Sequence, residues 1–304
     1  MISRYALTSL AVVLLSATWL ASPATGQAQR GDLLVPVGWV AERLNDPNLV
    51  LLHVGPEEDY EEGHIPGAHF LEFREASHPD SHQEGNLILE LPEPEAFQEA
   101  LRSWGVTRES NIVIYWGSEW VTPTTRVVFT LDWAGLGEQT RVLDGGLGAW
   151  TAAGRSTTSE VPEPGHGDVV IHPRDLVVGA AWVQEHAMAP GYQVVDGRAR
   201  AFFDGVRPDR DKEGHIPGAG SVPWTELIDE SLMLKDQASL REIFSAAGVE
   251  PGDTVVAYCH IGQYATMVLF AARILGHEVR LYDGAFQDWA ARDLPVTTES
   301  GNRE

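Results

Sequence analysis

Short apolar runs alternate with longer segments of helical periodicity along the second half of the chain. The runs at 193–195, 254–258 and 279–282 have the length and the apolar content of buried strands. Two segments with helical spacing, 240–247 and 265–275, are each followed by a glycine that can end a helix. This alternation predicts an α/β fold with a mainly parallel sheet and helices on both of its faces.

The same landmarks occur in the first half of the chain, in the same order. The hexapeptide Gly-His-Ile-Pro-Gly-Ala stands at 63–68 and again at 214–219, a separation of 151 positions. Three further pairs of segments resemble each other: 50–54 and 192–196, 111–116 and 254–259, and 143–150 and 282–289. A repeat of this length indicates two whole domains, because solenoid repeats are much shorter.

The repeat places an N-terminal domain at 29–154 and a C-terminal domain at 169–304. Residues 155–168 between them are polar and contain prolines that disfavour a helix, which is typical of a linker. Within the first domain, residues 74–95 form a polar stretch rich in Glu and Pro. We expect this stretch to be a surface insertion.

Two histidines in the insertion have a spacing that metal ligands on a helix would have. His78 and His82 are four positions apart, but Pro79 lies between them and no cysteine is near. A solvated loop is therefore the better prediction than a metal site.

The first 28 residues have the pattern of a secretory signal peptide. Arg4 supplies a positive start, and the mostly apolar run at 6–21 is shorter than the roughly 20 residues of a membrane span. Small residues at 22–24 and 26–28 offer two cleavage sites. We expect an exported, periplasmic protein with no stable membrane association after cleavage, and the alternative is an uncleaved anchor.

Acidic residues outnumber basic ones by a wide margin. The sequence has 21 Lys and Arg against 44 Asp and Glu, a formal net charge of −23 with neutral histidines. This charge argues against nucleic acid or an anionic membrane surface as a partner. An anionic substrate would also be repelled unless local Arg or Lys side chains offset the field.

The chain contains a single cysteine, Cys259, so it cannot form an internal disulfide. It follows the predicted strand at 254–258 and precedes the predicted helix at 265–275, where helix N–H groups and the helix dipole favour negative charge. Gly262 permits the tight curvature that lets several N–H groups converge. We predict a nucleophilic cysteine with a lowered pKa. The alternative is a buried structural cysteine.

His64 and His215 belong to the two Gly-His-Ile-Pro-Gly-Ala elements. Each could act as a base, but the element also occurs in the first copy, which has no nucleophile. A structural role for both histidines, in a fixed turn, is therefore the better interpretation.

The order of these motifs resembles the tandem rhodanese-family sulfurtransferases. The resemblance covers nearly all of 29–304, including Val-Val-Asp-Gly-Arg at 194–198 and the Asp-Gly…Trp ends of both copies. It implies that only the second α/β domain reacts, because Trp116 stands at the position that corresponds to Cys259. It further implies sulfur transfer without a metal or organic cofactor, from thiosulfate or a related donor, through a Cys259 persulfide, to cyanide or a thiol.

The resemblance also assigns two arginines to the donor. Arg198 matches the family arginine that contacts the anionic donor, and its alternative role is an ion pair between strand ends. Arg200 is a second candidate for the same contact.

The loop after the cysteine departs from the family pattern. Thiosulfate-specific members carry basic residues where this chain has His260 and Ile261, and histidine is largely neutral near pH 7. We expect the six residues at 259–264, with Gly262 in the middle, to form the loop. Gln263 and Tyr264 can offer hydrogen bonds at the pocket mouth. Trp224 is a candidate lining residue, with a core position as its alternative.

Two other functions compete with sulfur transfer. A cysteine phosphatase would need a longer loop with an arginine near its end, which this loop lacks. A non-catalytic module, a sulfane-sulfur carrier or a partner-binding domain, is favoured by the missing basic pair after Cys259.

Overall fold

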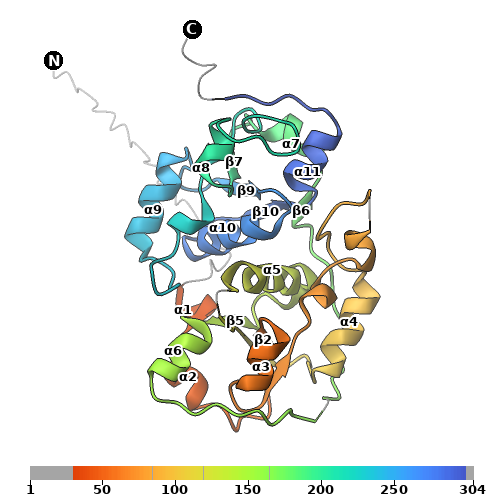
Figure 1. Ribbon diagram of the computed structural model, residues 1–304, viewed down its shortest axis with the longest axis vertical. Coiled ribbons are helices and arrows are strands. Elements are labelled where there is room, and N and C mark those ends of the chain that lie inside the picture. Colours follow the sequence, from red (N-terminus) through yellow and green to blue (C-terminus); the bar gives the residue numbers. More distant parts are fainter. Residues whose placement is uncertain (1–29, 84, 119, 164, 299–304) are drawn as a thin grey trace, which may run out of the picture.

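The computed structural model describes residues 30–83, 85–118, 120–163 and 165–298. The segment at 1–28 that we interpret as a signal peptide lies outside these residues. Figure 1 shows two α/β units stacked along the long axis of the molecule. The predicted architecture of two tandem α/β domains is confirmed.

The N-terminal domain is built on a sheet of five parallel strands in the order β1-β5-β4-β2-β3. The strands are β1 (Leu34–Val35), β2 (Leu49–Val54), β3 (Ala68–Phe70), β4 (Asn111–Trp116) and β5 (Thr140–Leu143). The helices are α1 (Arg30–Leu33), α2 (Val37–Ala41), α3 (Glu57–Glu62), α4 (Pro94–Ser103), α5 (Val121–Leu131) and α6 (Gly146–Ala152). A π-helical turn at Asp132–Leu136 follows α5.

The C-terminal domain repeats this topology. Its five parallel strands have the order β6-β10-β9-β7-β8, which is the order of the first sheet position by position. The strands are β6 (Val177–Val178), β7 (Tyr192–Asp196), β8 (Gly220–Ser221), β9 (Thr254–Tyr258) and β10 (Val279–Tyr282). The helices are α7 (Ala180–His186), α8 (Arg200–Phe203), α9 (Gln237–Ala246), α10 (Gln263–Ile274) and α11 (Ala285–Ala291).

The predicted elements of the second half are confirmed, with shifted ends for three of them. Strands β9 and β10 have the predicted bounds, whereas β7 is longer by one residue at each end. Helix α9 begins three residues early because the Asp236 carboxylate caps it, accepting hydrogen bonds from the amides of Ala238 and Ser239. Helix α10 begins at Gln263, two residues before the predicted start.

Both faces of each sheet are buried, and β9 shows how. Val255 and Ala257 point into a large core that spans the two domains, while Val256 and Tyr258 point into a second core under α7 and α11. All four side chains are fully buried. A strand covered on both faces reads as a continuous apolar run, which is why this strand was recognisable in the sequence.

Helices α5 and α10 pack against each other between the two sheets (Figure 1). Nearly every residue of both helices is buried, and their side chains belong to the core shared by the two domains. Polar groups join them as well: the hydroxyl groups of Thr125 and Thr266 lie 3.2 Å apart. The two domains therefore form one packed body.

The expectation that 74–95 is a surface insertion is only partly correct. Figure 1 shows this orange segment rising from the N-terminal domain beside the C-terminal domain. The side-chain amide of Gln287 binds both backbone groups of Ile88, at 2.9 and 3.0 Å, and Leu89 is buried. The end of the segment is held because its backbone polar groups find partners on the other domain.

Of the two histidines in this segment, His78 is the one whose side chain the structure describes. The two ring nitrogens of His78 bind the amide of Asp80 and the carboxylate of Glu93, as in a solvated loop. The side chain of His82 lies outside the described residues. Among the residues that are described, no cluster of three or more His, Cys, Asp or Glu side chains has a metal-binding arrangement.

The residues at 155–168 follow the N-terminal domain closely. Thr158 forms an antiparallel bridge with His64, and Gly165 and Gly167 donate to carbonyl groups at the end of α4.

Within the described part of the chain, no helix is both long enough and apolar enough to cross a membrane.

Candidate active site

Cys259 directly follows strand β9 and lies at the carboxyl end of the second sheet. Gly262 is the N-cap of α10, with a left-handed φ of 87° that favours glycine. The non-helical loop is therefore the four residues 259–262, and our expectation of six residues was wrong. Gln263 and Tyr264 already belong to the helix, because the glycine starts it directly.

The Cys259 thiol is enclosed by backbone. Its exposed fraction is 0%, and the backbone N–H groups of Ala265, Ile261, Tyr264 and Gly262 are directed at the sulfur. The predicted convergence of N–H groups is confirmed.

The predicted decrease in the Cys259 pKa is wrong. Burial raises the pKa of the thiol, and the four backbone N–H groups lower it by less. The ring of donors thus compensates in part for a desolvated position. It favours an anionic sulfur without making the thiolate the resting state at neutral pH.

Two consecutive residues at the start of α11 bind the backbone of the loop. The amide of Phe286 donates to the Cys259 carbonyl at 2.9 Å, and the amide of Gln287 donates to the His260 carbonyl at 3.2 Å. The start of α11 therefore fixes the backbone that carries the thiol.

Arg198 is fully buried, and its guanidinium group is surrounded by acceptors. It binds Asp196 through Nε and Nη2, the Gly214 carbonyl through Nη2 at 2.8 Å, and Asp209 through Nη1 at 3.2 Å. Burial opposes its charge, but Asp196 and Asp209 overcome this effect and raise its pKa. The geometry gives Arg198 the ion-pair role. Its contact with a donor stays a prediction.

His260 is held at the edge of the site by the same acid. Its Nδ1 lies 2.6 Å from Oδ2 of Asp209, and the ring stands edge-on to Phe202 at 4.6 Å between centroids. Burial raises the pKa of Asp209, but hydrogen bonds and charge from His260 and Arg198 outweigh it, so the pKa is lowered. The one titratable side chain beside Cys259 in the loop therefore already has a partner.

The remaining predicted site residues lie around the Cys259 loop and contact different parts of the protein. Arg200 forms a 3.4 Å ion pair with Glu226, and both side chains are about half exposed. Gln263 points to the other domain and donates to the Thr122 hydroxyl at 2.9 Å. The rings of Tyr264 and Trp224 lie 5.4 Å apart, so these two aromatic residues are neighbours. The side chain of Ile261 is half buried.

The Gly-His-Ile-Pro-Gly-Ala histidines have matching structural roles. His64 stacks on Tyr60 and its Nδ1 binds the Tyr60 carbonyl at 2.7 Å, while His215 stacks on Phe203 and binds the Phe203 carbonyl at 2.8 Å. Both side chains are buried. The structural interpretation of these elements is confirmed.

The N-terminal domain lacks the groups that the other site contains. His53 pairs in register with Tyr115 as Asp196 pairs with Tyr258, so His53 is the counterpart of Asp196. The pairing of segment 50–54 with segment 192–196 in the sequence was therefore one position out of register. Trp116, the counterpart of Cys259, is buried against Gly146. The first domain therefore has neither a counterpart of the Cys259 thiol nor one of the Asp196 carboxylate.

Sequence reasoning missed Arg126 and Asp283 as neighbours of the loop. The two side chains form a 2.6 Å ion pair across the domain interface, and both lie close to Gly262. They are 157 positions apart, and no local pattern links them. Asp283 was visible only as part of the repeated Asp-Gly element.

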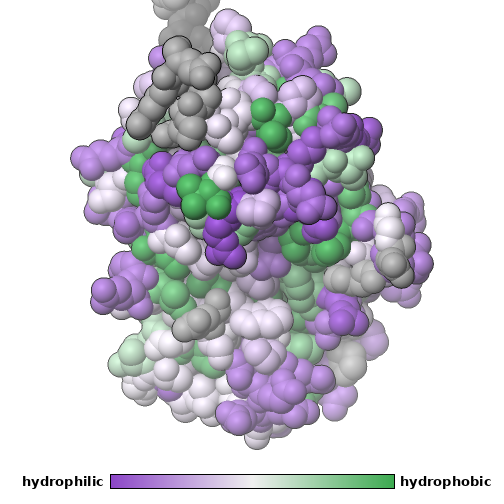
Figure 2. Space-filling view, turned by 45° about the horizontal axis from the view of Figure 1, so that its top comes forward, coloured by the Kyte–Doolittle hydropathy of each residue, from purple (hydrophilic) through white to green (hydrophobic). Residues whose placement is uncertain are grey.

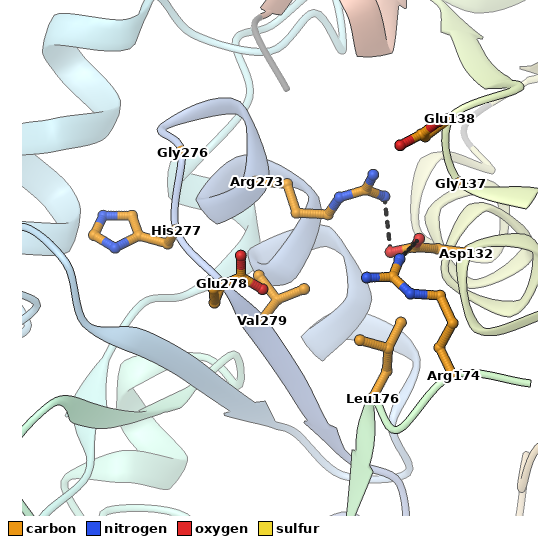
Figure 3. A pocket seen from close by; sticks show the side chains of 10 residues that line it. All are labelled: Asp132, Gly137, Glu138, Arg174, Leu176, Arg273, Gly276, His277, Glu278 and Val279. Carbon is orange, nitrogen blue, oxygen red and sulfur yellow. Dashed lines mark hydrogen bonds and ion pairs between the residues drawn. The ribbon is translucent and has the colours of Figure 1, made fainter. Parts of the chain in front are cut away.

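A separate pocket of about 150 Å³ lies at the other end of the helix pair (Figure 3). Asp132 is shared there by Arg273, at 3.1 Å, and by Arg174. Cys259 does not line this pocket. The pocket thus marks an interdomain ion-pair cluster that is distinct from the thiol loop.

The fold and the loop define a tandem α/β protein with one cysteine at the carboxyl end of a parallel sheet. The model of the rhodanese-like domain matches residues 36–153 and 179–292. The chain belongs to the rhodanese family.

Relatives of two kinds resemble this chain. The 3-mercaptopyruvate sulfurtransferase of Escherichia coli K12 is 34% identical over 283 residues, covering 86% of this chain and 96% of that one. The thiosulfate sulfurtransferase of Rattus norvegicus is 28% identical and covers 88% of this chain and 95% of that one.

Solved structures share the fold. SseA, a 3-mercaptopyruvate sulfotransferase from Escherichia coli, has a TM-score of 0.72 with 31% identity, over 83% of this chain and 98% of that one. An anaerobic ergothioneine biosynthesis enzyme from Chlorobium limicola has a TM-score of 0.75 with 22% identity, over 88% of this chain and 71% of that one. The second likeness shows the fold alone.

Proposed function

We propose that this protein is a sulfurtransferase that carries the transferred sulfur as a persulfide on Cys259. The observation that carries the proposal is the ring of four backbone N–H groups around the only thiol of the chain. Membership of the rhodanese family and relatives that are sulfurtransferases support it. A ring of this kind stabilises a sulfur anion, which both the attacking thiolate and the persulfide are.

The reaction has two displacements at sulfur. The Cys259 thiolate attacks the outer sulfur of thiosulfate, a new S–S bond forms, and the S–S bond of the donor breaks with its electron pair leaving on sulfite. Cyanide then attacks the terminal sulfur of the persulfide, and Cys259 leaves as the thiolate while thiocyanate forms. The covalent intermediate divides one transfer into two simpler steps.

Thiosulfate:cyanide transfer is the finer proposal, and 3-mercaptopyruvate is the competing donor. Relatives of both types support sulfur transfer in general. Around this loop Arg198 and His260 are both bound to Asp209, and Arg200 is paired with Glu226. Because these side chains already have partners, we expect weak binding of thiosulfate.

A donor panel tests the proposal. Thiosulfate and 3-mercaptopyruvate are each mixed with the protein, and intact mass is measured before and after cyanide is added. We expect a gain of one sulfur atom on Cys259 that cyanide removes. Cys259→Ser should show neither the adduct nor turnover. Full thiosulfate:cyanide transfer by Cys259→Ser would disprove the mechanism.

A sulfane-sulfur carrier is the second candidate, and the burial of Cys259 favours it. A thiol with an exposed fraction of 0% and a raised pKa can hold a persulfide without turning it over rapidly. In that case the mass gain would appear with the donor, but multiple turnovers with cyanide would not follow.

We further propose that the protein is exported to the periplasm after cleavage of residues 1–28. The support is the pattern of Arg4 followed by the apolar run at 6–21. Fusion of residues 1–28 to a reporter that is active only after export would give activity, and Arg4→Glu would reduce it. An inactive reporter with the natural segment would contradict export.

A further inference from the structure

Arg126 belongs to α5 of the N-terminal domain, yet its side chain ends in the C-terminal domain. It is fully buried, its Nη1 lies 2.6 Å from Oδ1 of Asp283, and its Nη2 donates to the Leu89 carbonyl. A methyl group added at Gly262 would lie only 3.3 Å from Nη1. The inactive domain thus brings a cation to the loop that carries Cys259.

Asp283 is the acid that this cation meets. Its carbonyl oxygen and Oδ1 would lie 3.1 and 3.3 Å from the same methyl group on Gly262, and its Oδ2 accepts from the Leu91 amide at 2.9 Å. Shortly after Asp283, the amides of Phe286 and Gln287 at the start of α11 donate to the carbonyl groups of Cys259 and His260. The Asp283 carboxylate therefore lies beside Gly262, next to the start of α11 that binds the backbone of the Cys259 loop.

An unpaired Asp283 would act against the chemistry of the loop. A buried carboxylate next to Gly262 repels a thiolate, a persulfide anion and an anionic donor. Glu90 lies close enough to Asp283 for their charges to interact, and burial followed by the charge of Asp283 raises the Glu90 pKa. With so much negative charge nearby, Arg126 is the group that balances it.

Other ionisable groups also face this region. They stay the same in the variants proposed below: Asp196 at the end of β7, Arg198 and Asp209 that bind each other, Tyr258 in β9, His260 in the loop, Tyr264 in α10, Tyr282 in β10, Glu90 in the segment 86–91, and Asp288 in α11.

We propose that Arg126 is a positioning residue for the Cys259 loop. It neutralises Asp283, fixes the turn between Asp283 and the residues that bind the Cys259 and His260 carbonyl groups, and keeps the surroundings of the thiol favourable to an anion. The proposal rests on Cys259 being the reacting group. It gives the N-terminal domain a defined part in the site, because the second domain alone would leave Asp283 without its cation.

The test measures how fast Cys259 reacts with iodoacetamide as a function of pH, in the full-length chain. Cys259 is the only thiol, so the mass gain reports this residue alone. Arg126→Met leaves Asp283 without a cation and should slow alkylation at neutral pH by about tenfold, the effect of one pH unit on the thiolate fraction. Asp283→Asn leaves the cation and should accelerate it.

Three further variants separate electrostatics from folding. The double variant Arg126→Met, Asp283→Asn should return close to the wild-type rate, and Arg126→Lys should keep most of it. Arg273→Met is the matched control, because it removes the interdomain pair with Asp132 at the far end of the same helices (Figure 3). It should reduce stability without changing the pH profile of alkylation.

Opposite effects of Arg126→Met and Asp283→Asn would support the proposal. Changes in the same direction, an unchanged pH profile for folded Arg126→Met, or an equal change for Arg273→Met would overturn it. If Arg126→Met does not fold, the acceleration by Asp283→Asn still decides the question. Alkylation needs no sulfur donor, so a failure here is distinguishable from a failure of the proposed sulfur transfer.

Discussion

At the scale of single residues, the buried side chains of Cys259 and His53 differ in the polar groups that surround them. Cys259 is desolvated but has four backbone N–H groups directed at its sulfur, whereas His53, the counterpart of Asp196, is desolvated without any hydrogen bond to its ring nitrogens from the described residues. Burial, and then the charge of His64, lower the pKa of His53 to about 4, although Asp59 acts in the other direction. The fold supports an anion at one position and only a neutral ring at the other.

The position of His53 predicts a pH dependence of stability. The ring is neutral when folded and takes up a proton near pH 6.5 when unfolded, so its contribution is complete above that pH and is lost as the pH falls towards 4. The loss is about 1.4 kcal/mol per pH unit and about 3 kcal/mol in total. Urea unfolding at several pH values should show that His53→Leu removes this part of the dependence.

The exposed His166 provides the control for this experiment. His166→Leu should keep the wild-type dependence on pH. If His53→Leu also kept it, protonation of His53 would not be the cause.

At the scale of elements, the helix pair α5–α10 is the centre of the molecule. The side chains of Thr125, Val128, Leu269 and Phe270 meet between the two helices. The same helices bring Arg126 to Asp283 and Gln263 to Thr122. The packing that joins the domains therefore also positions the start of α10 and the loop before it.

Leu269→Ala tests this interface. Leu269 is 1% exposed, and replacing a buried leucine by alanine costs about 3 kcal/mol through lost burial and an unfilled cavity. Because the core is shared, calorimetry should show one unfolding transition shifted to lower temperature. Two separate transitions, with only one of them shifted, would contradict the shared core. Val170→Ala, on the surface, should change little.

At the scale of the whole molecule, the face drawn in Figure 2 carries many hydrophilic side chains, with apolar side chains showing in patches between them. The formal net charge of −23 surrounds a site whose cations are paired. A donor such as thiosulfate therefore approaches against the field of the protein. This repulsion acts over the Debye length, which shrinks from about 30 Å at 0.01 M salt to about 8 Å at 0.15 M.

Raising the salt concentration should therefore increase kcat/KM for thiosulfate severalfold, because screening removes the repulsion. Steady-state rates at increasing potassium chloride would measure the effect. Alkylation of Cys259 by the uncharged iodoacetamide should change little over the same range. A decrease in kcat/KM with salt would mean that local cations attract the donor after all.

Much of the fold was predictable because its signals are local. The continuous apolar run of β9 and the glycine after α10 mark these elements in the sequence. The starts of α9 and α10 were predicted too late in the chain. The carboxylate cap at Asp236 and the left-handed Gly262 start these helices earlier than the apolar pattern indicates. The end of the 74–95 segment was misjudged because its partner, Gln287, is about 200 residues away along the chain.

The sequence by itself determined the repeat, the parallel sheets and Cys259 as the centre of the site, because each depends on residues near one another or on a repeated pattern. The tertiary structure alone decided the balance of charges: burial raised the pKa of Cys259, and Asp196 and Asp209 enclosed Arg198. It also brought Arg126 of one domain to Asp283 of the other. Such effects depend on distances through space and on the exclusion of water, which the order of residues does not display.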